Sequence, residues 1–148
     1  MIYNSNSPQD TERIAAELAK KLKQSDVVCL RGDLGAGKTA FVQGLVKGLG
    51  VTAPISSPTF TIVNCYTGGK MPVYHFDVYR IEDSDEMYEI GFDEYAYGDG
   101  ITVIEWPDNI ADILPDNAYN ITISKDYEKG ENFRYIETDT CLDDDGIG

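Results

Sequence analysis

The residues of this chain whose types and spacing best suit chemistry form one glycine-rich segment, Gly32-Asp33-Leu34-Gly35-Ala36-Gly37-Lys38-Thr39. The G-x-x-x-x-G-K-[ST] spacing is typical of a loop whose backbone N–H groups wrap the phosphates of a nucleoside triphosphate. In such a loop the ammonium of Lys38 contacts the β- and γ-phosphates, and the Thr39 hydroxyl is a ligand of Mg²⁺. The alternative is a glycine-rich turn without a ligand. We therefore expect a nucleotide site here.

The segments on either side of this loop fit the same interpretation. Residues 27–30 form a short apolar run rich in branched side chains, which is typical of a buried parallel strand. Apolar residues recur at helical spacing after the loop, and Gly50 stands where a helix would end. These apolar residues are Phe41, Val42, Leu45, Val46 and Leu49. Strand, loop and helix are thus predicted in the order that a phosphate-binding loop requires.

A phosphate-binding loop also needs an acidic partner at the end of a neighbouring strand, because Mg²⁺ prefers oxygen ligands. Glu105 follows the apolar run 101–104, and Asp77 follows residues 73–76. We predict Glu105 to be the metal carboxylate with Thr39, since its strand is the more continuously apolar, and Asp77 to orient or activate the attacking water. The predicted catalytic residues are Lys38, Asp77 and Glu105. The alternatives are an exposed strand-end acid for Glu105, and a pairing with Arg80 or a turn cap for Asp77.

Four nearby side chains have two interpretations each. His75, the sole histidine, is either structural or catalytic. Trp106 is either part of the core or a stacking surface for a base or a partner. Thr59 and Thr61 adjoin a segment bracketed by prolines, where a hydroxyl can sense the γ-phosphate, or they are ordinary strand residues.

The remaining patterns predict elements that surround the site. A helix is expected from Ser7 and Pro8 onward, a mobile loop at 54–58, a hairpin of strands 60–66 and 73–78, and an acidic helix from Ser84 that stops at Gly91. Strand 101–104, a short helical turn at 110–114 and a closing hairpin of strands 119–124 and 133–137 follow. The fold class is therefore α/β, a P-loop NTPase-type three-layer sandwich whose mixed, largely parallel central sheet carries antiparallel hairpins.

Length and charge bound the function. At 148 residues we expect one P-loop ATPase domain, 1–148, with a flexible acidic tail. The sequence contains no apolar run long enough to cross a membrane and no signal-peptide layout, which predicts a cytoplasmic protein.

The net charge is −14, and residues 81–124 contain no Lys or Arg. Such a field disfavours direct binding of RNA or DNA, although an acidic face can dock a basic protein. The three cysteines, Cys29, Cys65 and Cys141, are interpreted as small buried residues or inert thiols.

Taken together, the motifs resemble those of the bacterial TsaE (YjeE) ATPases of tRNA threonylcarbamoyladenosine biosynthesis. The resemblance runs from about Thr11 to Leu114. It comprises the phosphate loop, Ser57-Pro58-Thr59-Phe60-Thr61, Tyr74-His75-Phe76-Asp77-Val78-Tyr79-Arg80 and Ile104-Glu105-Trp106-Pro107. Two departures are Ala40, where many relatives carry a second Thr, and the chain after Asp116, which matches loosely. Loss of that hydroxyl leaves the backbone N–H of Ala40 in place.

This resemblance implies an ATPase that uses ATP and Mg²⁺ and works with a TsaD-like threonylcarbamoyl transferase and a TsaB-like paralogue. These partners modify the adenosine beside the anticodon in tRNAs that read codons beginning with A, so tRNA would be met only through the complex. The resemblance assigns Ser57 to Thr59 as a switch-like segment and Thr11 to the nucleotide. The expected nucleotide-binding residues are Thr11, Asp33, Leu34, Gly35, Ala36, Gly37, Lys38, Thr39, Ala40 and Thr59, and the expected metal ligands are Thr39 and Glu105.

Competing functions are a small-molecule kinase, a GTP-dependent switch, and a nucleotide-dependent assembly switch with little turnover. Kinases usually need basic lid residues, and residues 81–124 supply none. The sequence contains no [NT]-K-x-D motif for reading guanine on a strand-borne loop. It also contains no obvious arginine finger, with Arg80 as the nearest candidate, so we expect slow hydrolysis by the isolated chain.

Overall fold

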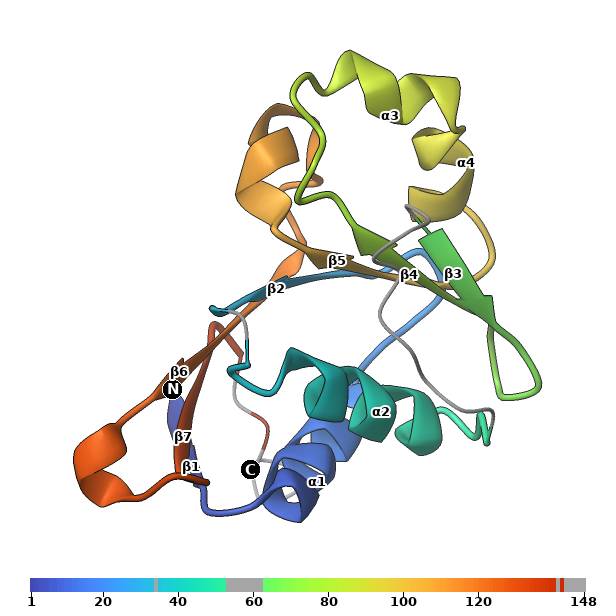
Figure 1. Cartoon of the computed structure of the whole chain (residues 1–148). Helices are drawn as coiled ribbons and strands as arrows, with labels where there is room; N and C mark the ends of the chain where they lie inside the picture. Colours follow the sequence, from blue (N-terminus) through green and yellow to red (C-terminus); the bar gives the residue numbers. More distant parts are fainter. Residues whose placement is uncertain (34, 53–62, 141, 143–148) are drawn as a thin grey trace.

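Seven strands of a single sheet form the centre of the part of the chain that is described, residues 1–33, 35–52, 63–140 and 142 of a computed structural model (Figure 1). The strands are β1 (Ile2–Ser5), β2 (Val27–Arg31), β3 (Val63–Tyr66), β4 (Val73–Asp77), β5 (Ile101–Glu105), β6 (Tyr119–Lys125) and β7 (Arg134–Thr138). Their order across the sheet is β1-β7-β6-β2-β5-β4-β3.

The middle of the sheet is parallel and its margins are antiparallel. Strand β2 pairs in parallel with β5 and with β6, and β5 pairs in parallel with β4. The pairs β3–β4, β6–β7 and β1–β7 are antiparallel. The predicted mixed, largely parallel sheet with antiparallel hairpins is thereby confirmed. Because parallel strands end at the same edge, the residues that follow β2, β4, β5 and β6 meet there.

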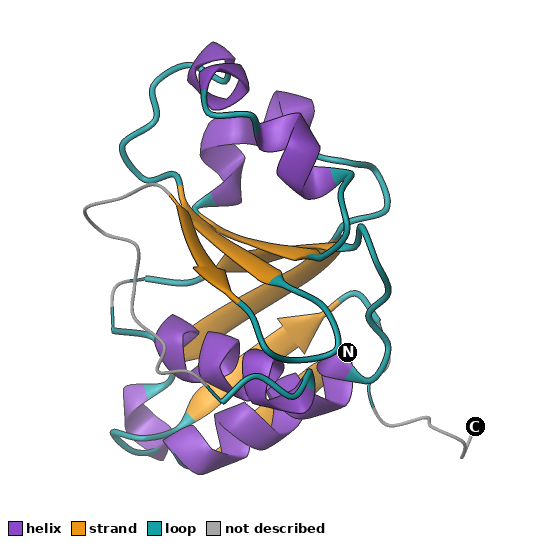
Figure 2. Cartoon of the chain, turned by 90° about the vertical axis from the view of Figure 1, so that its right-hand side faces the viewer, coloured by secondary structure: helices purple, strands orange, loops and turns teal. Residues whose placement is uncertain are grey.

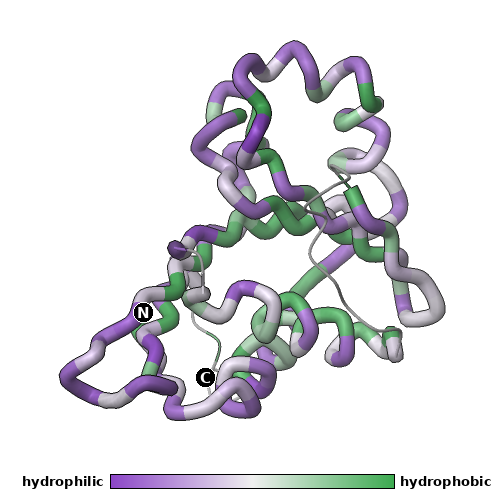
Figure 3. Tube along the Cα trace, viewed as in Figure 1, coloured by the Kyte–Doolittle hydropathy of each residue, from purple (hydrophilic) through white to green (hydrophobic). Residues whose placement is uncertain are grey.

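Helices cover both faces of the sheet, as Figures 1 and 2 show. Helices α1 (Pro8–Ala19) and α2 (Lys38–Gly48) lie on one face, and α3 (Asp85–Glu89), α4 (Phe92–Ala96) and the 3₁₀ helix η1 (Pro107–Ile113) lie on the other. A second 3₁₀ helix, η2 (Tyr127–Lys129), lies in the hairpin between β6 and β7. Figure 3 shows hydrophobic residues along the central strands and α2. Two buried apolar clusters lie between the sheet and the helices that cover it.

Three local features fix the helices next to the site. The Ser7 side chain accepts a hydrogen bond from the Asp10 backbone N–H at 3.1 Å, so the predicted helix start is confirmed. Helix α1 then packs closely on α2 at Gly44, where a Cβ atom would lie 2.2 Å from the Glu12 carbonyl oxygen. Gly50 follows the end of α2 with φ +89°, the left-handed conformation expected of a residue after a helix.

Several boundaries differ from the predicted ones. Strand β1 was not predicted; it is exposed on its outer side and is held by antiparallel pairing with β7. Strand β4 ends at Asp77 instead of Val78, and the predicted strand 60–66 is described only from Val63. The acidic helix stops before Gly91 as expected, but Gly91 (φ +77°) also begins a second short helix, α4. The predicted turn 110–114 is part of the longer helix η1.

The cysteines divide between core and surface. Cys29 on β2 is fully buried, as interpreted from the sequence, and this burial raises the pKa of its thiol to about 11. Cys65 on β3 is exposed, which contradicts the buried interpretation for that residue. Cys141 lies outside the described residues. Among the described residues, helices are all too short or too polar to span a membrane.

Candidate nucleotide-binding site

The phosphate loop joins the end of β2 to the start of α2, as predicted. Gly37 precedes the helix with φ +104°, a left-handed conformation that favours glycine, and Lys38 is the first residue of α2. The loop is tightened by a hydrogen bond from the Ala36 backbone N–H to the Asp33 carbonyl at 3.0 Å. The N–H groups of the first helical turn are thus presented at the carboxyl edge of the sheet, where a helix N-terminus favours anions. Leu34 lies outside the described residues.

Lys38 is buried beside Glu105 and Trp106. Its Nζ lies 3.7 Å from Glu105 Oε1 and 4.0 Å from the centroid of the Trp106 ring. Within the described part of the chain this buried ammonium has no hydrogen-bond partner. A buried cation without hydrogen bonds is costly. The position is therefore suited to a ligand that brings acceptor oxygens to Lys38.

The two predicted acids lie side by side. Strands β4 and β5 pair so that Asp77 is level with Glu105. Glu105 is 5% exposed, so the alternative of an exposed strand-end acid is wrong. Asp77 is partly exposed, and its Oδ1 accepts a hydrogen bond from the Tyr79 backbone N–H at 3.0 Å, which is the turn cap foreseen as an alternative. Asp77 and Arg80 are both described by the structure and do not form the ion pair that was the other alternative.

His75 and Trp106 both contact this group. His75 is fully buried, and its Nε2 lies 2.5 Å from Glu105 Oε2. Trp106 follows Glu105 with φ +64°, is partly buried, and packs against the exposed Tyr79 with ring centroids 4.8 Å apart. Trp106 also packs against the apolar cluster that contains Phe76, while its ring faces Lys38, so it takes part both in the core and in the wall of the candidate site.

The other predicted nucleotide residues are found near the start of α2 or lie outside the described part. Thr39 is exposed on the first turn of α2, and Asp33 and Gly35 are exposed in the loop. Thr11 is buried, with its hydroxyl 2.8 Å from Ser5 Oγ, and lines a small pocket of about 40 Å³. That pocket is also lined by Gly37, Ala40 and Arg134. Thr59 and Thr61 lie outside the described residues.

The C-terminal hairpin contributes two cations that the sequence analysis missed. Arg134 on β7 donates from Nε to the Ala36 carbonyl at 2.8 Å and from Nη2 to the Gly35 carbonyl at 3.4 Å. Lys125, at the end of β6, brings its Nζ to 3.3 Å from where a Cβ on Gly35 would lie. The available signal was that Lys125 ends a strand; what was lacking was the pairing of that strand with β2.

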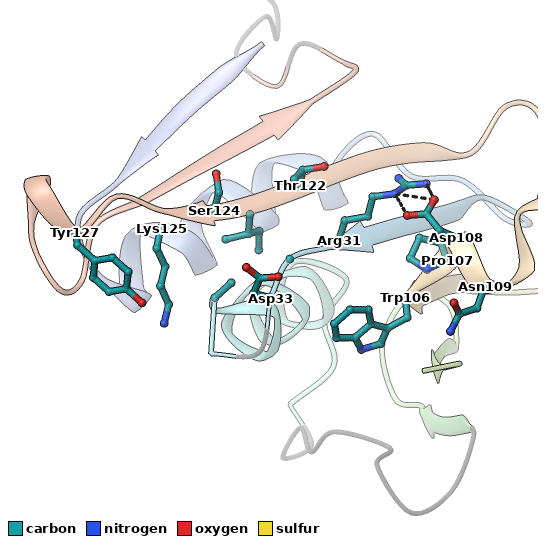
Figure 4. Close-up of a pocket in the computed structure, with 13 residues that line it drawn as sticks. Arg31, Asp33, Trp106, Pro107, Asp108, Asn109, Thr122, Ser124, Lys125 and Tyr127 are labelled. Atoms are coloured by element: carbon teal, nitrogen blue, oxygen red, sulfur yellow. Dashed lines mark hydrogen bonds and ion pairs between the residues drawn. The ribbon is translucent and has the colours of Figure 1, made fainter. Parts of the chain in front are cut away.

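A larger pocket of about 500 Å³ adjoins the loop (Figure 4). Figure 4 shows Trp106 on one side of it and Lys125 on the other, with Asp33 between them. Arg31 and Asp108 form an ion pair at its edge, with Nη2 to Oδ1 at 2.9 Å. That hydrogen-bonded pairing raises the pKa of the Arg31 guanidinium and lowers the pKa of the Asp108 carboxyl. Arg31 is thus already engaged by a protein carboxylate.

Known proteins resemble this chain in fold and in sequence. The crystal structure of YdiB from Bacillus subtilis aligns with a TM-score of 0.79 and 36% identity over 93% of this chain and 83% of that one, which supports the P-loop α/β fold. The tRNA threonylcarbamoyladenosine biosynthesis protein TsaE of Bacillus subtilis is 45% identical over 123 residues, 83% of this chain and 77% of that protein. The TsaE protein of Treponema pallidum is 45% identical over 120 residues, 81% of this chain and 87% of its own length.

A family model covers most of the sequence as well. The model described as threonylcarbamoyl adenosine biosynthesis protein TsaE matches residues 5–133, which include the phosphate loop, both acids and Lys125. The match therefore extends past Asp116, into the part of the chain where the motifs resemble the family only loosely. On the strength of this match and of the two relatives, the chain belongs to the TsaE family.

Proposed function

We propose that this protein binds ATP with Mg²⁺ and hydrolyses it in support of threonylcarbamoyladenosine formation in tRNA. In this proposal it acts on a complex of a TsaD-like transferase and a TsaB-like paralogue, which hold the tRNA and transfer the group. Membership of the TsaE family supports the pathway. The proposal of ATP binding rests on the phosphate loop itself.

The observation that carries the proposal is the burial of the Lys38 ammonium without a hydrogen-bond partner in the part of the chain that the structure describes. Its ammonium is buried at the mouth of the loop, next to the start of α2, and has no hydrogen-bond partner among the described residues. A site designed only for stability would give such a group a hydrogen-bond partner or expose it, whereas Glu105 Oε1 lies 3.7 Å away, beyond hydrogen-bond distance. A triphosphate would supply the acceptor oxygens, with Lys38 against the β- and γ-phosphates and the backbone N–H groups of residues 37–40 around them.

The acidic residues fit a metal ion shared with the nucleotide. Within the described ranges, clusters of three or more His, Cys, Asp or Glu able to hold a metal by themselves are not found. Mg²⁺ in nucleotide sites needs few protein ligands, because phosphates and water supply the rest. We assign Thr39 and Glu105 as its protein ligands. Bound with ATP, the ion would neutralise developing charge on the phosphate oxygens. Asp77, level with Glu105 and partly exposed, would orient the attacking water.

The arginines support slow turnover by the isolated chain. Arg13 pairs with Asp10, Arg31 pairs with Asp108, and Arg134 is bonded to carbonyls of the loop. The fourth arginine of the sequence, Arg80, is exposed beyond the end of β4. A missing arginine finger costs roughly 10³ to 10⁵ in rate. We therefore expect the partner proteins to accelerate phosphate release.

Calorimetry with ATP, with and without Mg²⁺, tests the binding step. We expect wild-type protein to bind ATP, Lys38→Ala to lose binding, and Glu105→Ala to retain some binding but lose its dependence on Mg²⁺. Lys47→Ala is the matched control, because Lys47 is exposed on the same helix and pairs with Glu12 instead of the loop. Failure of the folded wild-type chain to bind ATP or ADP would refute the proposal. An unchanged Mg²⁺ dependence in Glu105→Ala would assign the metal to Asp77.

Phosphate release with and without the TsaD-like and TsaB-like proteins tests the catalytic step. The expected result is slow release by the chain alone and faster release in the complex. Fast turnover in isolation, or phosphoryl transfer to an added metabolite, would favour a kinase-like or independent hydrolase instead. Binding without any turnover, even in the complex, would favour an assembly switch.

A further inference from the structure

His75 is a buried side chain that has no role in the proposed reaction as described so far. It lies on β4 in the same face of the sheet as Asp77, since side chains alternate along a strand. The strand pairing places Asp77 level with Glu105, and His75 level with Val103. Glu105 nevertheless places Oε2 2.5 Å from His75 Nε2, reaching back along the sheet past its direct neighbour. The contact therefore selects one orientation of the carboxylate.

We propose that His75 is a positioning residue that holds Glu105 ready to bind the metal. Its hydrogen bond occupies Oε2, and the other oxygen, Oε1, faces the Lys38 ammonium at 3.7 Å. This inference rests on the proposed function, since it assigns to Glu105 the role of metal ligand. Outer hydrogen bonds of this kind fix the orientation of ligating carboxylates and strengthen metal binding.

The hydrogen-bond chemistry of the pair indicates which nitrogen carries the proton. A carboxylate only accepts hydrogen bonds, so His75 Nε2 must be the donor. The other nitrogen, Nδ1, is buried and has no hydrogen-bond partner among the described residues. The imidazole therefore carries a proton on Nε2, which it donates to Glu105.

Removal of His75 would also change the relation between Glu105 and Lys38. At 3.7 Å the two groups are close but not hydrogen bonded. A carboxylate freed from His75 would close on the ammonium, because a buried charge seeks a hydrogen-bonded partner. The Glu105 carboxylate would then be turned away from the metal. His75 thus keeps the site open as well as oriented.

Imidazole ¹⁵N spectra of the nucleotide-free protein test the contact directly. His75 is the sole histidine, so its signals need no assignment. We expect the proton on Nε2, and a large shift of that signal in Glu105→Ala. Asp77→Ala, which removes the neighbouring acid on the same face, is the matched control and should leave the signal in place. An Nε2 that carries no proton, or signals indifferent to Glu105→Ala, would overturn the proposal.

Magnesium titration of the ATP complex tests the consequence. Trp106 is the sole tryptophan and lies 4.0 Å from Lys38 Nζ, so its fluorescence reports on the site. We expect His75→Leu to raise the Mg²⁺ concentration for half-maximal response by roughly 10- to 100-fold, with ATP binding without Mg²⁺ little changed. His75→Gln, which can place an amide N–H near Glu105, should restore most of the affinity. A folded His75→Leu protein with wild-type Mg²⁺ dependence would overturn the proposal.

One further control variant and the experiments above keep the result interpretable. Tyr74→Phe removes a hydroxyl bonded to Asp99 from the opposite face of β4 and should leave the Mg²⁺ dependence unchanged. If His75→Leu does not fold, His75→Gln and the ¹⁵N spectra decide. If the wild-type chain binds no ATP, the proposed function fails, whereas the ¹⁵N spectra still establish or refute the orientation of Glu105 by His75.

Discussion

Three polar side chains are buried together at the head of the phosphate loop. Lys38, His75 and Glu105 are each less than a tenth exposed, and Lys38 Nζ and His75 Nδ1 have no hydrogen-bond partners among the described residues. Each such group lowers stability by about 1 to 3 kcal/mol relative to a satisfied one. Most of the other buried side chains among the described residues are apolar. The local rules of folding are thus broken where the sequence predicts a ligand.

Cys29 is also a buried polar group, but it lies in the apolar core and its thiol is expected to be chemically unreactive. Burial raises the pKa of its thiol to about 11, so very little thiolate is present near neutral pH. We expect iodoacetamide at about pH 8 to modify the exposed Cys65 while sparing Cys29. Mass spectrometry of the labelled peptides measures this, with labelling in denaturant as the control. Equal labelling of both cysteines in the folded protein would contradict the burial.

The same thiol makes stability depend on pH in the alkaline range. The folded pKa lies above the ordinary value of 9.0, so the unfolded chain loses its proton first as the pH rises. The free energy of unfolding should therefore be unaffected by Cys29 below about pH 9 and fall between about pH 9 and 11. Denaturant unfolding across this range measures the slope. Cys29→Ala should show a smaller decline, and an identical decline would refute the assignment.

At the scale of elements, the contact between α1 and α2 holds the helix that carries Lys38. A Cβ at Gly44 would meet the Glu12 carbonyl oxygen at 2.2 Å and the Glu12 Cα at 2.5 Å, both backbone atoms. Gly44→Ala must therefore move one helix away from the other. We expect the free energy of unfolding to fall by about 1 to 3 kcal/mol, despite the higher helix propensity of alanine.

Lys47→Ala is the control for this substitution, because Lys47 lies on the same helix as Gly44 and also contacts Glu12. Lys47 pairs with Glu12 at 3.0 Å on the surface. Such pairs are worth about 1 kcal/mol or less. Chemical denaturation should separate the two variants clearly. Equal stability of Gly44→Ala and wild type would show that α1 and α2 can separate without cost.

Arg134 links the closing hairpin to the phosphate loop. Its guanidinium binds the carbonyls of Ala36 and Gly35, which directs the loop backbone. A hydrogen bond from a charged group is worth about 1.5 to 3 kcal/mol, so we expect Arg134→Leu to weaken ATP binding about 10- to 100-fold. Calorimetry measures this effect. Lys129→Ala removes a charge from the same hairpin, where Lys129 lies over Phe133, and should bind as wild type does.

At the scale of the whole molecule, charge limits the partners that can bind directly. The net charge is −14, and residues 81–124, which include α3, α4 and η1, contain no basic side chain. Nucleic-acid binding relies on phosphate neutralisation by Lys and Arg. We expect the isolated chain not to bind tRNA even at low salt, as measured by filter binding, whereas its association with the partner proteins should weaken as salt rises. Direct tRNA binding would contradict the proposed division of labour.

Much of the site could be predicted from the sequence because its signals are local. The loop, its flanking strand and helix, and the acids that end β4 and β5 each lie within a short stretch whose pattern states its structure. The pairing of the C-terminal hairpin with β2 and with β1 could not be predicted from local patterns. Strand β1 was missed because four residues carry little periodicity, and it exists through pairing with β7 more than 120 residues away.

The sequence by itself determined that a loop with the spacing of a phosphate-binding motif follows a buried strand and that carboxylates stand at the ends of two others. Only the tertiary structure decided that Glu105 turns to His75, that Lys38 is buried against Trp106, and that Arg134 binds a carbonyl 98 residues earlier. The reason is that strand order sets these contacts. Periodicity specifies which face of an element is buried, but the pairing of β6 with β2 is fixed by packing of the whole sheet.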